Sequence, residues 1–203
     1  MLDLIIKNGK CYIDGELKDA DVAIKDKKIH KIGQISEEAK EIIDASNHTV
    51  LPGCIDTQTH FREPGSTDTE DLHSGSRAAI AGGITSVFEM PNTNPPTSNK
   101  KEFQRKLDLA KNRMYCNYAF YFGATADNAD DLASLKDLEG CCGIKLFAGS
   151  STGNLLVAEE DDIDKVFQNS SKVVAVHSED EAILKVNKKL IKHGDVHTHP
   201  VWR

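Results

Sequence analysis

Residues 51–65 of this 203-residue chain read LPGCIDTQTHFREPG. The stretch starts with apolar residues and then turns polar, a pattern typical of a buried strand that runs into a loop. Within it, Gln58, His60 and Arg62 alternate with other residues. Because side chains repeat with period two along a strand, we expect all three on one side of an extended strand. The stretch therefore predicts a strand with chemically capable side chains at its carboxyl end.

The same order of strand, loop and helix repeats along the rest of the chain. We expect strands at residues 49–55, 84–89, 116–122, 143–147 and 173–177. We expect helices to follow them at residues 70–81, 100–113, 127–138, 159–168 and 179–193. The first helix has Thr67 and Thr69 as N-cap candidates and Gly82-Gly83 as its stop. Such a series predicts a parallel sheet with right-handed crossovers, either an open doubly wound sheet or a barrel.

The first fifty residues follow a different rhythm, with short apolar runs separated by turn residues. Asn8-Gly9, Asp14-Gly15 and Asp26-Lys27-Lys28 each lie between such runs. Asn-Gly and Asp-Gly pairs are the strongest short signals for a two-residue hairpin. We therefore expect residues 1–50 to form a small antiparallel β unit and residues 51–203 to form a second domain.

Composition restricts the partners and the environment of the chain. Its 25 basic and 32 acidic residues give a net charge of −7, which argues against general attraction to nucleic acid or to anionic membranes. No apolar run reaches the ~18 residues of a membrane span, and Asp3 stands where a signal peptide carries basic residues. The five cysteines are odd in number and show no CxxC spacing, so we expect free, buried thiols in a reducing cytoplasm.

Two histidines and a lysine are the candidate metal ligands. His60 and His177 each lie at the end of an apolar strand run, and neutral imidazole is a good ligand for zinc. Lys145 is flanked by Ile144 and Leu146, so burial should lower the pKa of its ammonium group. A neutral lysine amine can react with carbon dioxide to give a carbamate, an anionic oxygen ligand able to bridge two metal ions. Two interpretations stay open: a metal centre, or structural histidines with a lysine whose head reaches water.

A second group of histidines lies near the end of the chain. His193, His197 and His199 fall within residues 193–200, which read HGDVHTHP and include a His-x-His pair. Such a pair suits a metal ion, but this stretch follows the last expected helix rather than an apolar strand. We therefore favour a solvated loop over a metal site here.

Residues 51–65 resemble the opening signature of the dihydroorotases, which belong to the cyclic amidohydrolase superfamily. The resemblance continues through residues 88–93 (FEMPNT), 143–147 (GIKLF) and 176–180 (VHSED). The hairpins of residues 1–50 likewise resemble the small β-sandwich that accompanies the barrel in this superfamily. The resemblance spans essentially the whole chain. It implies an α/β fold, the first five βα units of a TIM-like (β/α) barrel preceded by part of a β-sandwich.

The resemblance implies a role for each matching residue. His60 and His177 would bind one or two zinc ions, and a carboxylated Lys145 would bridge them. Arg62 and Asn92 would grip the carboxylate of the substrate, as suits a guanidinium fork and an amide donor. The implied reaction interconverts N-carbamoyl-aspartate and dihydroorotate in pyrimidine biosynthesis, with water activated by the metal. The implied partners are a small-molecule substrate and either a second copy of the chain or a carbamoyltransferase.

Two features depart from the family pattern. Gln58 stands where the family usually has histidine, and its amide carbonyl is a weaker ligand, so the first metal position is expected to be loose or empty. A complete barrel needs roughly 250 residues, and the family's later histidine ligand and catalytic aspartate would lie beyond Arg203. We therefore expect the chain to be a fragment of a longer protein, inactive on its own.

Two alternative functions stay open. An allantoinase or hydantoinase would share the lysine and much of the metal set without needing Arg62 and Asn92 together. The other alternative is a non-catalytic barrel that scaffolds a partner. Gln58 in place of a histidine ligand agrees with this function, but a scaffold would not need Lys145 and His177.

Overall fold

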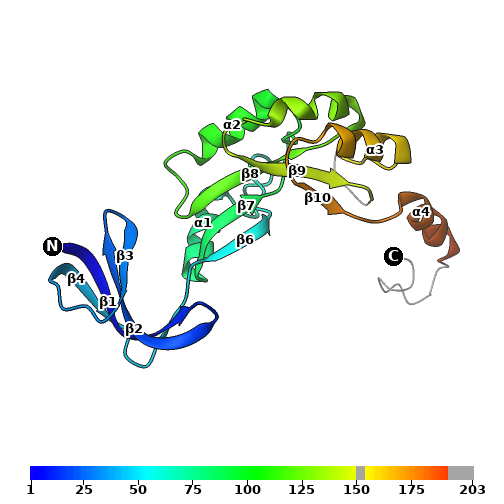
Figure 1. Cartoon of the computed structure of the whole chain (residues 1–203). Helices are drawn as coiled ribbons and strands as arrows, with labels where there is room; N and C mark the ends of the chain where they lie inside the picture. Colours follow the sequence, from blue (N-terminus) through cyan, green and yellow to red (C-terminus); the bar gives the residue numbers. More distant parts are fainter. Residues whose placement is uncertain (150–153, 192–203) are drawn as a thin grey trace. The chain divides into compact units, whose positions relative to one another are not determined.

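The computed structural model describes residues 1–149 and 154–191 of the chain (Figure 1). The chain divides into two compact units, Met1–Gly53 and Cys54–Arg203. Each unit has its own sheet and its own apolar core. Within the described ranges, every helix is too short or too polar to span a bilayer.

The first unit is a five-stranded sheet in the order β3-β2-β1-β4, with β5 also pairing on β1. Its strands are β1 (Leu2–Ile13), β2 (Glu16–Lys25), β3 (Lys28–Gly33), β4 (Ala39–Asp44) and β5 (Thr49–Val50). Asp14-Gly15 and Asp26-Lys27 close the two hairpins, and all four residues have positive φ, as a type I′ turn requires. β1, β2 and β3 are antiparallel as expected. The expectation of a wholly antiparallel unit is wrong, because β4 and β5 pair with β1 in parallel.

The expected turn at Asn8-Gly9 is also wrong, because β1 runs through these residues. Asn8 has a φ of 62°, and the pairing of β1 with β2 shifts register between Ile6 and Gly9, which indicates a β-bulge. Neighbouring strands hold this bulge. The Asn8 backbone N–H donates to Asp21 Oδ1 (2.9 Å), and Asn8 Nδ2 donates to Asp44 Oδ1 (3.0 Å). These long-range hydrogen bonds stabilise a bulge at Asn8-Gly9, although this pair of residues locally favours a turn.

The second unit is a parallel five-stranded sheet in the order β10-β9-β8-β7-β6. Its strands are β6 (Cys54–Thr59), β7 (Ile84–Glu89), β8 (Asn117–Gly123), β9 (Cys141–Phe147) and β10 (Val174–His177). Its helices are α1 (Leu72–Ala81), α2 (Lys100–Ala110), the 3₁₀ helix η1 (Ala126–Leu135), α3 (Glu160–Asn169) and α4 (Glu181–Leu190). The predicted fold class is confirmed: five βα units of a (β/α) barrel that follow a separate small sheet.

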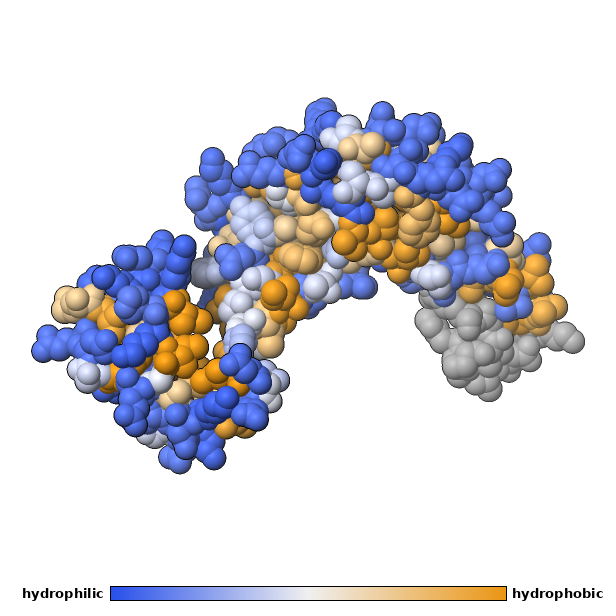
Figure 2. Space-filling view, in the orientation of Figure 1, coloured by the Kyte–Doolittle hydropathy of each residue, from blue (hydrophilic) through white to orange (hydrophobic). Residues whose placement is uncertain are grey.

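The main core of the second unit lies between this sheet and the helices on one of its faces (Figure 1). It includes large side chains from strands and helices, among them Leu72, Phe103, Phe120, Phe122, Leu132, Ile144 and Leu146. Because side chains alternate along a strand, Tyr121 of β8 and Lys145 and Phe147 of β9 lie on the opposite face. Figure 2 shows hydrophilic residues over α2 and α3 and hydrophobic residues over β10, where Val176 is 38% exposed.

The ends of the first predicted strand and helix need correction. The strand expected at residues 49–55 divides into β5, which joins the first sheet, and β6, which joins the second. Asp71 caps α1, in place of Thr67 or Thr69. Asp71 Oδ1 accepts from the Ser74 N–H (2.6 Å), and Ser74 Oγ accepts from the Asp71 N–H (3.1 Å), which makes a reciprocal capping box. The predicted stop is confirmed, because Gly82 is the C-cap.

The helix expected at residues 127–138 is a 3₁₀ helix, η1, rather than an α-helix. Its buried residues recur every three positions, at Ala129, Leu132 and Leu135. A helix with three residues per turn places such residues on one face, toward the core.

The five cysteines are free thiols, as expected. Cys11, Cys116 and Cys141 are buried and Cys142 is partly buried. Cys54 is exposed, which corrects the expectation that every thiol is buried.

Candidate active site

The first candidate residues lie at the carboxyl end of β6. Thr59 and Phe61 are buried and Phe61 joins the core, so Gln58 and His60 lie on the other side of the strand. Gln58 is exposed and His60 is half-buried. The expectation of one extended strand is wrong for Arg62, because β6 ends at Thr59 and Arg62 has a φ of 62°. The backbone therefore leaves the extended conformation where Arg62 begins the loop.

His60 lies among the charged and polar residues of the site. Burial lowers the pKa of its imidazole, and the nearby charge of Arg62 lowers this pKa further, as do the charges of Lys145 and Lys106. The Asn92 side chain contacts the imidazole and opposes this lowering. The imidazole is therefore neutral at neutral pH, which is the form that binds a metal ion.

Asn92 lies in a tightly bonded loop after β7. The Met90 N–H donates to the Thr59 carbonyl (2.9 Å), and the Thr97 N–H donates to the Pro91 carbonyl (2.9 Å). Asn92 Oδ1 is buried and has no hydrogen bond of normal geometry to any described residue. Because a buried polar atom without a partner costs free energy, this oxygen marks a place for a donor or a cation.

Lys145 is buried in β9, with 3% of its surface exposed. Burial lowers the pKa of its ammonium group. Its Nζ lies 4.9 Å from the centre of the Phe147 ring and makes no hydrogen bond or ion pair with a described residue. This environment favours the interpretation of Lys145 as a buried amine over that of a lysine whose head reaches water.

His177 is the last residue of β10. It pairs in register with Phe147 of β9, and the two rings stack with 6.1 Å between their centroids. Its Nε2 forms a hydrogen bond with the carboxylate of Glu179. Phe147 therefore contacts both Lys145 and His177 on the face of the sheet opposite the main core.

Lys145 is related to both sets of predicted site residues. Its charge, like that of Arg62, lowers the pKa of His60, and its Nζ lies 4.9 Å from the centre of the Phe147 ring, which stacks on His177. In residues 1–149 and 154–191, no three His, Cys, Asp or Glu side chains form a group that could hold a metal ion. The remaining candidates, His193, His197 and His199, lie outside the described residues.

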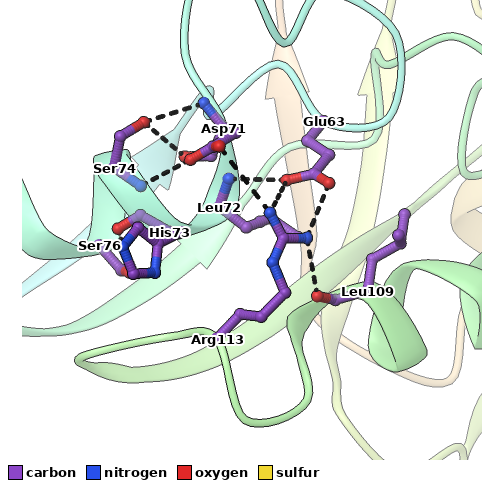
Figure 3. A network of polar contacts seen from close by, with 8 residues as sticks. All are labelled: Glu63, Asp71, Leu72, His73, Ser74, Ser76, Leu109 and Arg113. Atoms are coloured by element: carbon purple, nitrogen blue, oxygen red, sulfur yellow. Dashed lines mark hydrogen bonds and ion pairs between the residues drawn. The ribbon is translucent and has the colours of Figure 1, made fainter.

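A polar network that sequence reasoning missed holds the loop that carries Arg62 (Figure 3). The Glu63 carboxylate accepts two hydrogen bonds from Arg113, Nη1 to Oε1 (2.8 Å) and Nη2 to Oε2 (3.1 Å). It accepts a third from the Leu72 N–H at the start of α1 (2.9 Å). Arg113 also donates to the Leu109 carbonyl (3.0 Å). No local pattern could signal this pair, because its members are 50 positions apart.

A second missed pair lies between the sheet and α2. Glu89 and Lys106 are both buried and form an ion pair, and Lys106 Nζ donates to the Met90 carbonyl (2.8 Å). Burial raises the pKa of Glu89 to about 7 and lowers that of Lys106. One signal for this pair exists in the sequence, because Lys106 falls with Phe103 and Ala110 on the apolar face of α2.

The loops after β6 and β7 hold each other in place. The Asn94 N–H donates to the Pro64 carbonyl (2.9 Å). Gly65 has a φ of 123°, and a Cβ at this position would lie 2.8 Å from Asn94 Cβ, so only glycine fits. The segments that carry Arg62 and Asn92 are therefore joined.

The sequence profile of the amidohydrolase family matches residues 49–201. The chain belongs to the amidohydrolase family. The match includes every strand of the parallel sheet and all of the candidate site residues. Amidohydrolases are generally metal-dependent, which agrees with the kind of side chains gathered here.

Relatives of this amidohydrolase include dihydroorotases and allantoinases. The dihydroorotase of Methanosarcina mazei is 36% identical over 200 residues, which cover 97% of this chain and 43% of the relative. Allantoinases of Escherichia coli are 40% identical over 149 residues, which cover 73% of this chain and 33% of the relative. The resemblance to dihydroorotases seen in the sequence is confirmed. The chain spans less than half the length of these relatives.

Solved structures of hydantoinases share the fold of this amidohydrolase. The L-hydantoinase (dihydropyrimidinase) of Arthrobacter aurescens matches with a TM-score of 0.85 and 29% identity, over 94% of this chain and 44% of that chain. The dihydropyrimidinase of Brevibacillus agri matches with a TM-score of 0.78 and 27% identity, over 94% of this chain and 42% of that chain.

The candidate side chains of this amidohydrolase include atom types that serve as metal ligands. His60 offers a neutral imidazole, and the His177 ring lies on the face of the sheet that Lys145 shares. Lys145 is a buried amine that makes no hydrogen bond or ion pair with a described residue. Asn92 Oδ1 is a buried oxygen that likewise has no hydrogen-bond partner among the described residues. Such nitrogen and oxygen donors suit a divalent ion of the first transition row.

Proposed function

We propose that this amidohydrolase acts as a dihydroorotase, which interconverts dihydroorotate and N-carbamoyl-aspartate by opening and closing a cyclic amide. The observation that carries the proposal is the hydrogen bond that joins the loops of Arg62 and Asn92, from the Asn94 N–H to the Pro64 carbonyl (2.9 Å). Both side chains also influence the pKa of His60. A guanidinium and an amide next to an imidazole ligand suit a substrate that carries a carboxylate on the ring to be opened. The identity with the Methanosarcina mazei dihydroorotase over nearly the whole chain supports the same activity. We place the reaction in pyrimidine biosynthesis in the cytoplasm.

We assign zinc as the metal and His60, Lys145 and His177 as its ligands, with Gln58 as a weak further donor. When bound, zinc supplies a Lewis acid for the amide carbonyl and lowers the pKa of a water molecule. Only the neutral amine of Lys145 can react with carbon dioxide, and burial favours that form. The resulting carbamate adds anionic oxygens that compensate for the small number of His, Asp and Glu ligands.

Arg62 and Asn92 bind and orient the substrate in this proposal. The Arg62 fork binds the ring carboxylate through two parallel hydrogen bonds. The Asn92 amide N–H donates a further hydrogen bond to the same carboxylate. Fixing the carboxylate by two residues holds the amide carbonyl of the ring in one orientation, which lowers the entropic part of the barrier.

Allantoinase is the second candidate function, favoured by the 40% identity with the Escherichia coli allantoinases. Allantoin and hydantoin carry no carboxylate on the ring. A substitution at Arg62 should therefore change the KM for dihydroorotate but not the KM for allantoin, and this difference discriminates between the two functions.

The test compares hydrolysis of dihydroorotate, allantoin and hydantoin by the full-length, Zn²⁺-loaded gene product. We expect turnover of dihydroorotate, and we expect Arg62→Lys to raise its KM on the order of tenfold, because lysine keeps the charge but loses the fork. Arg105→Lys, at an exposed position of α2 paired with Glu102, is the matched control. Hydrolysis of allantoin without dihydroorotate, or a wild-type KM in Arg62→Lys, would overturn the proposal.

A further inference from the structure

We propose that Arg113, through its ion pair with Glu63, positions Arg62 and so sets the preference of the site for substrates that carry a carboxylate. The inference rests on the proposed function, in which Arg62 binds the substrate carboxylate. Arg113 is a positioning residue in this scheme, because it acts through the backbone of the loop and not on the substrate.

Arg113 is held by protein acceptors. Its two terminal nitrogens each donate to one oxygen of Glu63, at 2.8 and 3.1 Å, and such a planar double contact fixes orientation as well as distance (Figure 3). Nη1 also donates to the Leu109 carbonyl (3.0 Å), and Nη2 lies 3.8 Å from Asp71 Oδ2. These contacts commit the guanidinium to the protein, so Arg113 does not itself serve as the substrate clamp.

Glu63 is held from a second direction by α1. Its Oε2 accepts the Leu72 N–H (2.9 Å), one of the first amides of the helix, which have no acceptor within the helix itself. The Glu63 side chain is only 9% exposed. The loop after β6 is therefore fixed to the start of α1 and to the segment that follows α2 (Figure 3).

Arg62, the residue directly before Glu63, needs such support. Its φ of 62° is in the left-handed region, which is unfavourable for a residue with a side chain and persists where neighbours hold it. On its other side, the Ser66 N–H donates to the Arg62 carbonyl (3.0 Å). The Arg62 side chain is exposed and makes no hydrogen bond with a described residue, so the backbone is what sets the direction in which this side chain leaves the loop.

The first test measures the binding of two related rings by one variant. In the Zn²⁺-loaded full-length protein, Arg113→Met should raise the KM for dihydroorotate about tenfold, with kcat nearly unchanged. Inhibition by dihydrouracil, the same ring without its carboxylate, should stay at the wild-type value. Arg113→Lys keeps the charge but loses the fork, and should give a smaller rise in KM. Arg105→Met, on the exposed face of α2, is the matched control and should behave as wild type.

The second test needs no activity and follows the backbone directly. Hydrogen exchange of the Ser66 amide reports on the loop, because this amide donates to the Arg62 carbonyl. We expect faster exchange of Ser66 in Arg113→Met than in wild type, with no change in Arg105→Met. If the methionine variant does not fold, the same exchange measurement is made on Arg113→Lys, which keeps a charged partner for Glu63. Exchange of Ser66 should again be faster than in wild type.

The outcomes separate this proposal from the proposed function. A higher KM for dihydroorotate with unchanged inhibition by dihydrouracil and faster Ser66 exchange supports the positioning role. Equal weakening of both ligands, or no change in KM and exchange, overturns it. If the wild type does not hydrolyse dihydroorotate, the proposed function fails by itself and Ser66 exchange decides: faster exchange supports the positioning of Arg62, and unchanged exchange overturns it.

Discussion

The Nζ atom of Lys145 lies 4.9 Å from the centre of the Phe147 ring. The ring attracts the charged form of the amine, whereas burial disfavours that form. Burial dominates, because the pKa of Lys145 is lowered. Phe147 also stacks on His177. One aromatic ring therefore contacts both the lysine amine and the histidine.

Replacing Lys145 by methionine should change how stability depends on pH. Because burial lowers the folded-state pKa of Lys145, the folded chain binds this proton less tightly than the unfolded chain, whose lysine keeps its ordinary value of 10.5. The free energy of unfolding of the wild type should therefore rise as pH increases from the folded-state pKa toward 10.5. Lys145→Met should be more stable than wild type at neutral pH, and the difference should shrink toward pH 10.5.

Urea unfolding of the metal-free protein in bicarbonate-free buffer, repeated across this pH range, measures the effect. Lys101→Met, at an exposed position of α2, removes one positive charge elsewhere and serves as the control. A constant difference between Lys145→Met and wild type at all pH values would contradict the prediction.

The buried pair of Glu89 and Lys106 should be more sensitive to the loss of one member than of both. Lys106→Met leaves a buried carboxylate without its partner and should lower the free energy of unfolding by about 3–5 kcal/mol. The double variant Glu89→Gln, Lys106→Met removes both charges and should recover a large part of that loss. Urea denaturation curves of the wild type, both single variants and the double variant give the coupling energy. Additive losses would show that the charges do not interact.

Gly75 in α1 should resist replacement by alanine, although alanine is the better helix former. A Cβ at Gly75 would lie 2.8 Å from two atoms of the Phe61 ring, so the added methyl group overpacks the core. We expect Gly75→Ala to lower the free energy of unfolding by about 1–3 kcal/mol. Gly82→Ala is the matched control: this C-cap has a φ of −88° and ordinary contacts of 3.5 Å or more, so stability should be unchanged or slightly higher. Thermal and urea unfolding would contradict the prediction if both variants gained stability.

Metal affinity should depend on His60 and His177. His60→Ala or His177→Ala should each weaken Zn²⁺ binding by more than the roughly 10–100-fold that is typical of residues beyond the ligands. His30→Ala, at an exposed position of β3, is the control and should bind like wild type. Competition of the protein with a chelating dye measures the affinity. Wild-type affinity in both histidine variants would remove them from the ligand set.

The parts of the fold that local signals determine could be predicted from the sequence. β7 occupies its predicted range, Ile84–Glu89, because Gly83 and Pro91 bound the apolar run on both sides. Asn8 shows the limit of such signals: its backbone N–H donates to Asp21 and its side chain donates to Asp44, and both acceptors come from other strands. A local pattern contains no information about these partners.

The same distinction applies to the site. His60, Asn92 and Lys145 each lie in or just after an apolar strand, and parallel strands bring such positions to one end of the sheet, so a pattern can single them out as candidates. Arg113 follows α2 in a polar segment and gains its role from Glu63, 50 positions earlier. The left-handed backbone of Arg62 likewise depends on contacts that only the folded loop supplies.

The close approach of Gly65 to Asn94 limits how laboratory evolution could reshape this protein. A library that randomises only the loop after β6 would lose most members that replace Gly65, because the other loop leaves no room for a side chain. Mutations of the two loops are therefore coupled, and beneficial changes in one would depend on changes in the other. New substrate preferences would be reached more readily by varying both loops together, with Gly65 kept fixed.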